Sequence, residues 1–337
     1  MSSVHSCTAC VHPCSFPDRC GATTIIRMHI HPAPIVLLSL LAGCSDDAPR
    51  GPVGDRVAVP GDRFYPEGVA FSAAGDMFVS SIATGQIARV ASGSADAETF
   101  VAPGVLGSSL VAMAMARDGD LLWACLGTFG TDFPPALLGI DARTGTERVR
   151  HHFPPQQDGR TGGLCNEIAE DAAGNVYASD SFGARIVRVL AADRETPDRA
   201  AVWARGPELA AAMFGINGIT FDGAGAVLAV NTESGALVRV DVATAAITPV
   251  ALARPLAMPD GVRLAAPGRA IVVEQGTGSV STIDLATGAV DVVAIGLRQP
   301  TSLDVIDDAA WVSEGQLRHL FDTTPPELPF VVVRVAI

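Results

Sequence analysis

The chain has 337 residues, of which 48% are hydrophobic and 18% charged, and its formal net charge at neutral pH is −13. This apolar fraction is enough to fill a large core, and the acidic balance argues against a nucleic-acid-binding protein, which needs a basic surface. All 23 basic residues are arginine. Chemistry through a lysine Schiff base or a phosphate-loop lysine is therefore excluded as well.

The N-terminal region reads as a targeting segment. A short apolar run within His29–Cys44 ends in Leu41-Ala42-Gly43-Cys44, and polar residues follow it. The run is too short to span a bilayer as a permanent helix. It resembles a bacterial lipoprotein signal with its lipobox, in which Cys44 would be lipidated. We therefore expect an exported protein of the bacterial cell envelope that meets the membrane only through this anchor. The alternative is a buried strand of the folded domain.

The chain then divides into four parts. Residues 1–27 are expected to be a non-native or disordered extension, because Met28 stands immediately ahead of the signal-like run. Residues 28–44 would be the lipoprotein signal peptide, 45–55 a Gly/Pro-rich tether, and 56–337 the folded domain. The extension holds four cysteines at spacings open to zinc, but no second Cys-x-x-Cys motif and no apolar periodicity beside it support that function. These cysteines are Cys7, Cys10, Cys14 and Cys20.

The folded domain repeats itself six times. Short alternating apolar runs broken by Gly and Asp turns are typical of strands and hairpins. Repeats of about 40–50 residues, each with about four strands, indicate a β-propeller. We predict an all-β fold, a six-bladed β-propeller with four-stranded antiparallel blades. Phe330–Ile337 would be the outer strand of blade six, and a strand near Arg56–Pro60 would join that blade and close the ring.

One register of the repeat predicts a cation site. It starts the innermost strand of each blade, at one mouth of the central channel, and reads Glu67, Val111, Asn166, Asn217, Asp260 and Pro300. Two carboxylates and two amides are the hard oxygen ligands that Ca²⁺ prefers, whereas softer metals would call for His or Cys. We predict that Glu67, Asn166, Asn217 and Asp260 bind Ca²⁺, with Mg²⁺, Mn²⁺ or Zn²⁺ as alternatives. The alternative function of these residues is turn formation.

A second ring of polar residues lies fourteen residues further along and should return to the same mouth. It reads Ser81, Cys125, Asp180, Asn231 and Glu274, with Glu314 in the shifted sixth repeat. We assign Asp180 and Glu274 to acid–base catalysis and Ser81 and Asn231 to substrate contact. The alternative is that each is a polar strand end facing water. Phe214 is a further substrate contact, from a segment, Pro207–Phe214, that is either a lid over the mouth or a connecting loop.

Cys125 and Cys165 are the two cysteines beyond Cys44. They fall toward the same mouth in adjacent blades, so a disulfide is feasible in an exported protein. An inert buried thiol remains an alternative. So does a cysteine nucleophile activated by His151 or His152.

The ordered motifs resemble the superfamily of six-bladed propellers that contains gluconolactonase, senescence marker protein and the luciferin-regenerating enzyme, with paraoxonases as more distant relatives. The resemblance covers roughly residues 60–320. Its motifs are Pro66-Glu67-Gly68, Cys165-Asn166-Glu167-Ile168, Ile216-Asn217-Gly218-Ile219 and Pro259-Asp260-Gly261-Val262. Three departures stand out: Leu110–Met115 lacks the histidine pair of paraoxonases, Gly261 replaces one of their metal-side asparagines, and the arginine that binds sugar lactones has no secure counterpart.

The resemblance implies a metal-dependent hydrolase of lactones or related esters. The cation would polarise the substrate carbonyl, and Asp260 would be the general base, with Glu274 or Asp180 as alternatives. A non-catalytic, surface-anchored binding propeller with a structural calcium is the main rival. A propeller resembling strictosidine synthase, which condenses amines with aldehydes without metal, is a third possibility that the oxygen ligands argue against.

Overall fold

A computed structural model of the chain describes residues 51–128 and 133–337. The predicted N-terminal extension, the signal peptide with Cys44, and the first part of the tether lie outside the described residues. In the described part of the chain, no helix is long and apolar enough to cross a membrane.

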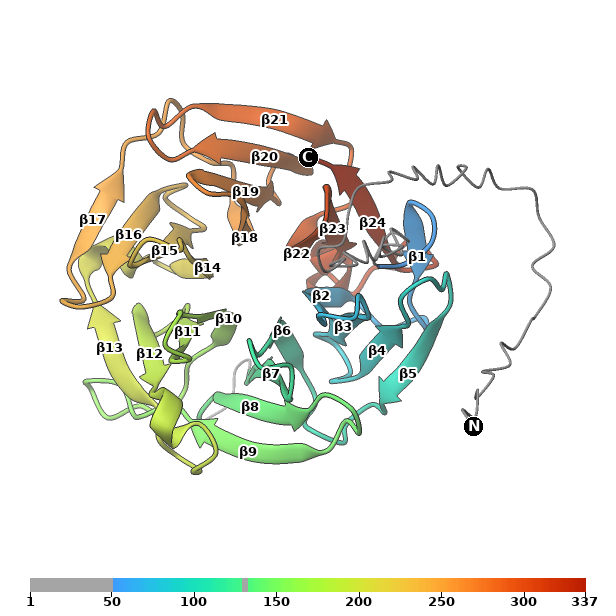
Figure 1. Cartoon of the computed structure of the whole chain (residues 1–337), viewed down its shortest axis with the longest axis horizontal. Helices are drawn as coiled ribbons and strands as arrows, with labels where there is room; N and C mark the ends of the chain where they lie inside the picture. The colour runs from blue at the N-terminus through green and yellow to red at the C-terminus, as the bar shows by residue number, and fades with distance from the viewer. Residues whose placement is uncertain (1–50, 129–132) are drawn as a thin grey trace, which may run out of the picture. The chain divides into compact units, whose positions relative to one another are not determined.

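Six antiparallel sheets of four strands stand around a central axis, which confirms the six-bladed β-propeller (Figure 1). Blade one consists of β2 (Pro66–Phe71), β3 (Met77–Ser81), β4 (Ile87–Val90) and β5 (Ala97–Val101). Blade two consists of β6 (Leu110–Met115), β7 (Leu121–Leu126), β8 (Ala136–Asp141) and β9 (Glu147–His152). Blade three consists of β10 (Cys165–Glu170), β11 (Val176–Asp180), β12 (Arg185–Val189) and β13 (Ala201–Arg205).

The remaining blades follow the same plan. Blade four consists of β14 (Ile216–Phe221), β15 (Ala226–Asn231), β16 (Leu237–Asp241) and β17 (Ile247–Val250). Blade five consists of β18 (Pro259–Ala266), β19 (Arg269–Glu274), β20 (Ser279–Asp284) and β21 (Val290–Ile295). Blade six consists of β22 (Pro300–Ile306), β23 (Ala309–Glu314), β24 (Val331–Ala336) and β1 (Arg56–Ala58). Short helices occur at η1 (Ala191–Asp193), η2 (Pro207–Leu209) and α1 (Leu317–Phe321).

Blade six closes the ring with strands from both ends of the domain. β1 pairs with β24, with Arg56 opposite Val333 and Ala58 opposite Val331. The predicted joining of the two terminal segments is therefore confirmed. The order within the blade was predicted wrongly, because β24 is the third strand and β1 is the outermost.

Strand pairing corrects the predicted registers in two blades. The first residue of each inner strand pairs with the last residue of the next strand, as Pro66 does with Ser81. In blade six Pro300 pairs with Glu314, so Thr301, and not Pro300, is the equivalent of Glu67. In blade two Leu110 pairs with Leu126, so Leu126 replaces Cys125 in the second ring. The first hairpin is one residue shorter in blade six and one residue longer in blade two, which moves each register by one.

Glycines beside the predicted ligands let neighbouring inner strands come close together. A Cβ atom on Gly68 would lie 2.7 Å from the backbone nitrogen of Met113, and one on Gly218 would lie 2.1 Å from the carbonyl oxygen of Asp260. Real side chains do not tolerate such distances. The glycine that follows Glu67 and Asn217 therefore has a packing role, and it allows neighbouring inner strands to converge.

Candidate functional site

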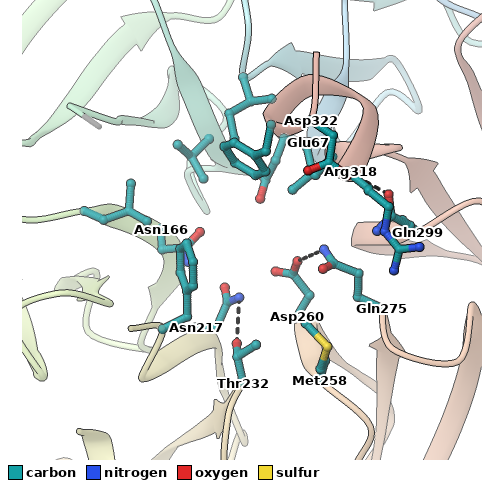
Figure 2. A pocket seen from close by; sticks show the side chains of 16 residues that line it. Glu67, Asn166, Asn217, Thr232, Met258, Asp260, Gln275, Gln299, Arg318 and Asp322 are labelled. Atoms are coloured by element: carbon teal, nitrogen blue, oxygen red, sulfur yellow. Dashed lines mark hydrogen bonds between the residues drawn. The ribbon is translucent and has the colours of Figure 1, made fainter. Parts of the chain in front are cut away.

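A cavity of about 340 Å³ lies at the mouth where the innermost strands begin. The four predicted ligands, Glu67, Asn166, Asn217 and Asp260, all line it, and their exposed fractions are only 4–7%. Figure 2 shows their side-chain oxygens directed into one shared space. Apolar walls surround this oxygen-lined floor: Ile82, Val111, Leu164, Phe214, Leu317 and Phe321. The structure thus brings together the tetrad that the repeat register predicts.

Unusual backbone geometry marks the entry to three of the six inner strands. Tyr65, Met258 and Gln299 adopt positive φ angles of 45°, 50° and 50° immediately before a proline. Non-glycine residues rarely adopt this conformation, and such strain concentrates at functional sites. Met258 and Gln299 line the cavity. This sharp turn delivers each strand to the axis with its second residue at the channel mouth.

A ring of polar residues one position beyond the predicted second ring supports three of the predicted ligands. Asn166 Nδ2 donates to Ser181 Oγ at 2.8 Å, and Asn217 Nδ2 donates to Thr232 Oγ1 at 3.0 Å. Gln275 Nε2 donates to Asp260 Oδ2 at 3.2 Å (Figure 2). We call Ser181, Thr232 and Gln275 the supporting ring. Sequence reasoning missed it, although a count of fifteen residues from each ligand, in place of fourteen, finds it.

The supporting hydroxyls determine which way the two asparagine amides face. Ser181 Oγ donates to the carbonyl of Ile216 at 2.5 Å, and Thr232 Oγ1 donates to the carbonyl of Pro259 at 2.9 Å. Each hydroxyl has one proton and uses it there, so it accepts from the asparagine NH₂ group. The Oδ1 atoms of Asn166 and Asn217 consequently remain free for the cavity, which suits a hard cation.

The two carboxylates of the tetrad carry a large electrostatic cost. Burial, and then the charges of Asp260 and Glu167, raise the pKa of Glu67 well above its usual value, with Arg263 opposing. Burial, and then the charge of Glu167, likewise raise the pKa of Asp260. Without a cation, two carboxylates in one buried site repel each other, and protonation of one of them is favoured. A bound divalent cation would offset this repulsion and keep both carboxylates ionised.

A buried ion pair occupies the channel next to the tetrad. Glu167 follows Asn166 where the other ligand-bearing strands carry glycine, and its Oε2 lies 3.0 Å from Nη1 of Arg263. The two side chains are 4% and 12% exposed. Burial raises the pKa of Glu167, and Arg263 opposes that rise. The charge of Arg263 partly offsets the repulsion between Glu167 and Glu67.

The predicted catalytic carboxylates of the second ring do not line the cavity. Asp180 lies fully buried, with Oδ2 2.8 Å from Nε of Arg185, and its Oδ1 accepts from the backbone of Leu164 and Gly183. Glu274 accepts from both terminal nitrogens of Arg254 at 2.7 Å. Hydrogen-bond donors already occupy these carboxylates, which hold the loops at the mouth.

The other members of the second ring also bind loops. Ser81 donates to the carbonyl of Phe64, and Asn231 Nδ2 donates to the carbonyls of Glu208 and Ala210. Glu314 pairs with Arg298. A one-residue shift along a strand moves a side chain to the opposite face, which is why this ring misses the cavity that Thr232 and Gln275 of the supporting ring line. Phe214, in contrast, lines the cavity as expected.

Cys125 and Cys165 form a disulfide between β7 and β10, with their Cα atoms 5.1 Å apart. Of the alternatives left open by the sequence, the disulfide is thus the one observed, and a thiol nucleophile is excluded in this state. His151 and His152 lie on β9, the outermost strand of blade two. His151 bonds to the carbonyl of Arg194, and His152 to Asp198.

Helix α1 supplies cavity residues that the sequence did not predict. Arg318 and Asp322 line the cavity from the connection between β23 and β24, together with two apolar residues of the helix. Residues 1–50 and 129–132 aside, the structure has no group of three or more His, Cys, Asp or Glu side chains arranged to hold a metal. The candidate ligands would act as a mixed set of two carboxylates and two amides.

The fold and this site define a six-bladed β-propeller with an oxygen-lined, apolar-walled cavity at one mouth. No protein family matches the chain in a scan of family profiles, and a search of curated proteins finds no relative by sequence. Solved structures do match it. Virginiamycin B lyase from Staphylococcus aureus is 12% identical with a TM-score of 0.58, and the match covers 84% of this chain and 98% of the lyase.

Two other similar structures show how widely this architecture is used. A PQQ-bound aldose sugar dehydrogenase from Streptomyces coelicolor is 15% identical with a TM-score of 0.59, covering 84% of this chain and 96% of the dehydrogenase. The WD40 repeats of RRP9 are 12% identical with a TM-score of 0.57, covering 78% of each chain. Identities this low establish the fold alone. Two of the three proteins are enzymes by name.

Proposed function

We propose that the protein is a metal-dependent hydrolase of lactones or related esters, as the resemblance to the gluconolactonase superfamily implies. The observation that carries the proposal is the buried oxygen tetrad on the floor of a cavity with mostly apolar walls. A catalytic cavity needs a polar group at the reacting atom and a wall that holds the rest of the substrate.

The residues present fit a divalent cation with a preference for oxygen. Glu67, Asn166, Asn217 and Asp260 would hold it, and Ca²⁺ is the first choice because hard oxygen ligands suit it best. When bound, the cation polarises the substrate carbonyl and stabilises the developing oxyanion. Mg²⁺, Mn²⁺ and Zn²⁺ remain alternatives.

Asp260 is the proposed general base. It would take a proton from a water molecule as the water oxygen attacks the acyl carbon and the ester or lactone bond to oxygen breaks. Coordination to the cation would lower the basicity of Asp260, so the carboxylate would have to loosen from the cation or share the proton through water. Gln275 donates a hydrogen bond to Oδ2 of Asp260, and this bond fixes the orientation of the whole carboxylate. Asp180 and Glu274 are not retained as bases, because arginines and backbone amides already occupy their oxygens.

A binding propeller with a structural calcium is the second candidate. It is favoured by the absence of any histidine among the described residues that line the cavity.

We also propose that Cys44 is lipid-modified and that the protein is exported to the cell envelope, which is compatible with either function. The Cys125–Cys165 disulfide supports export, because such bonds persist in oxidising compartments. Replacing Cys44 with Ala should release the protein from the membrane fraction.

The test is an assay of lactones and aryl esters after removal of metal with a chelator. Hydrolysis should return with added Ca²⁺ and disappear in Asp260→Ala. Asp291→Asn is a matched control, because Asp291 is exposed on the outer strand of blade five. Stabilisation by Ca²⁺ with no turnover of any substrate would favour the binding propeller.

A further inference from the structure

A second cavity of about 400 Å³ adjoins the first. Four residues line both cavities and form the boundary between them: Met258, Gln275, Gln299 and Arg318. They come from the loops and helix at the mouth of blades five and six. Arg318 therefore lies beside both the cavity that contains the tetrad and the second cavity.

The boundary carries a cation that no acidic side chain neutralises. Among the described residues, no ion pair involves Arg318; its backbone nitrogen donates to Oε1 of Gln299 at 2.8 Å, and its carbonyl accepts from the backbone nitrogen of Asp322. Asp322 lines the first cavity but not the second. An anionic group placed in the second cavity would thus meet the guanidinium of Arg318 without meeting the carboxylate of Asp322.

The one carboxylate that lines the second cavity already has a partner. Glu327 lies 3.4 Å from Nη1 of Arg298, whose Nη2 also lies 2.6 Å from Glu314. Arg298 is therefore committed to two acids, whereas Arg318 has no ion-pair partner in the part of the chain that the structure describes. The chain as a whole has a net charge of −13, so this arginine is a local positive charge that would attract an anionic group to the candidate reaction site.

The boundary also connects the second cavity to the proposed base. Gln275 faces both cavities while its Nε2 donates to Oδ2 of Asp260 (Figure 2). A substituent in the second cavity therefore lies one side chain away from the tetrad. Amide groups of Gln275 and Gln299 would supply further donors to an anion there.

We propose that the natural substrate carries a carboxylate, which binds Arg318 in the second cavity while the ester or lactone carbonyl lies at the tetrad. This inference rests on the proposed function and narrows its substrate class. Arginine suits this role, because its planar guanidinium binds a carboxylate through two parallel hydrogen bonds. The apolar walls of the first cavity would then hold the uncharged body of the substrate.

The experiment compares two esters that differ mainly in charge, 4-carboxyphenyl acetate and its methyl ester, with Ca²⁺ present. Arg318→Met should lower kcat/KM for the carboxylate by about five- to ten-fold, a modest factor because Arg318 is exposed. Its kcat/KM for the methyl ester should stay within about two-fold. Arg318→Lys should retain part of the preference, and Arg143→Met, an exposed arginine in the turn between β8 and β9, should change neither value.

Binding of two unreactive amides separates this inference from the proposed function. 4-Acetamidobenzoate should bind more tightly than its methyl ester, and Arg318→Met should abolish the difference, even if no ester is hydrolysed. If esters are hydrolysed but Arg318→Met lowers both kcat/KM values equally, the carboxylate inference is wrong and the hydrolase proposal stands. If neither amide binds and no ester is hydrolysed, both are wrong.

Discussion

The side-chain nitrogen of Asn217 donates to the hydroxyl of Thr232 at 3.0 Å, and that hydroxyl donates in turn to the carbonyl of Pro259 at 2.9 Å. The chain of hydrogen bonds runs from blade four to the residue before Asp260. It therefore links the orientation of one predicted ligand to the backbone that positions another.

Removal of this hydroxyl should weaken cation binding. In Thr232→Val the amide of Asn217 loses one of the acceptors that hold its orientation. We therefore expect the Ca²⁺ affinity to fall by about ten-fold, as is typical when a group supporting a metal ligand is lost. Isothermal titration calorimetry measures it. Thr248→Val, at an exposed position of β17, is the control. An unchanged affinity in Thr232→Val would contradict the supporting role.

Cation binding should also strengthen as the pH rises. The folded-state pKa values of Glu67 and Asp260 are raised. In the metal-free protein these groups therefore stabilise the fold at a pH below the pKa values that they have in the unfolded chain. That contribution is lost as the pH rises through the raised values, because the folded state then gives up bound protons. Ca²⁺ replaces those protons, so its stabilising effect should grow over the same interval.

The measurement is the increase in Tm caused by Ca²⁺ at about pH 5 and at about pH 8. We expect a clearly larger increase at the higher pH, and a small increase at both in Asp260→Asn. Equal increases in the unmodified protein at the two pH values would show that Glu67 and Asp260 do not bind the cation.

Asp180 should prove structural. Asp180 and Arg185 are fully buried, and Oδ2 of Asp180 lies 2.8 Å from Nε of Arg185. Removing one charge of this pair leaves the other buried without a partner. Asp180→Asn should therefore lower the free energy of unfolding by about 3–5 kcal/mol while kcat/KM per folded molecule is kept. Denaturant titration and active-site-normalised kinetics test this.

A matched control is the exposed pair of Asp158 and Arg160, 2.7 Å apart. Asp158→Asn should leave the denaturation midpoint nearly unchanged, because exposed ion pairs contribute little to stability. If Asp180→Asn folds with full stability but loses activity, the catalytic role that the sequence predicts for Asp180 is right.

Reduction of the disulfide should destabilise the propeller. Cys125 and Cys165 are 40 residues apart in sequence, and closing a loop of this size restricts the unfolded chain. We expect the Cys125→Ala, Cys165→Ala variant to lose about 2–4 kcal/mol of unfolding free energy in urea titration. A reducing agent should destabilise the original protein similarly and leave the variant unchanged. Insensitivity of the original protein would mean that the thiols are not paired in solution.

Comparison of the two rings of polar residues shows where sequence reasoning succeeded and failed. Glu67, Asn166, Asn217 and Asp260 were found because each follows the first residue of an inner strand, and the axis brings all such positions together. The supporting ring was missed by one residue. Neighbouring positions of a strand face opposite ways. An error of one residue therefore selects Asn231, which binds a loop, in place of Thr232, which lines the cavity.

The sequence by itself determined the six repeats, their strands and the oxygen tetrad, because alternation and turn residues are local signals that recur at a regular spacing. The tertiary structure decided which side chains meet across blades: the disulfide, the Glu167–Arg263 pair, and the approach of Arg318 to the cavity. These contacts depend on hairpin lengths and on the closure of the ring by β1 and β24, which lie at opposite ends of the domain. No local pattern encodes such long-range pairing, since it arises only when the whole ring packs together.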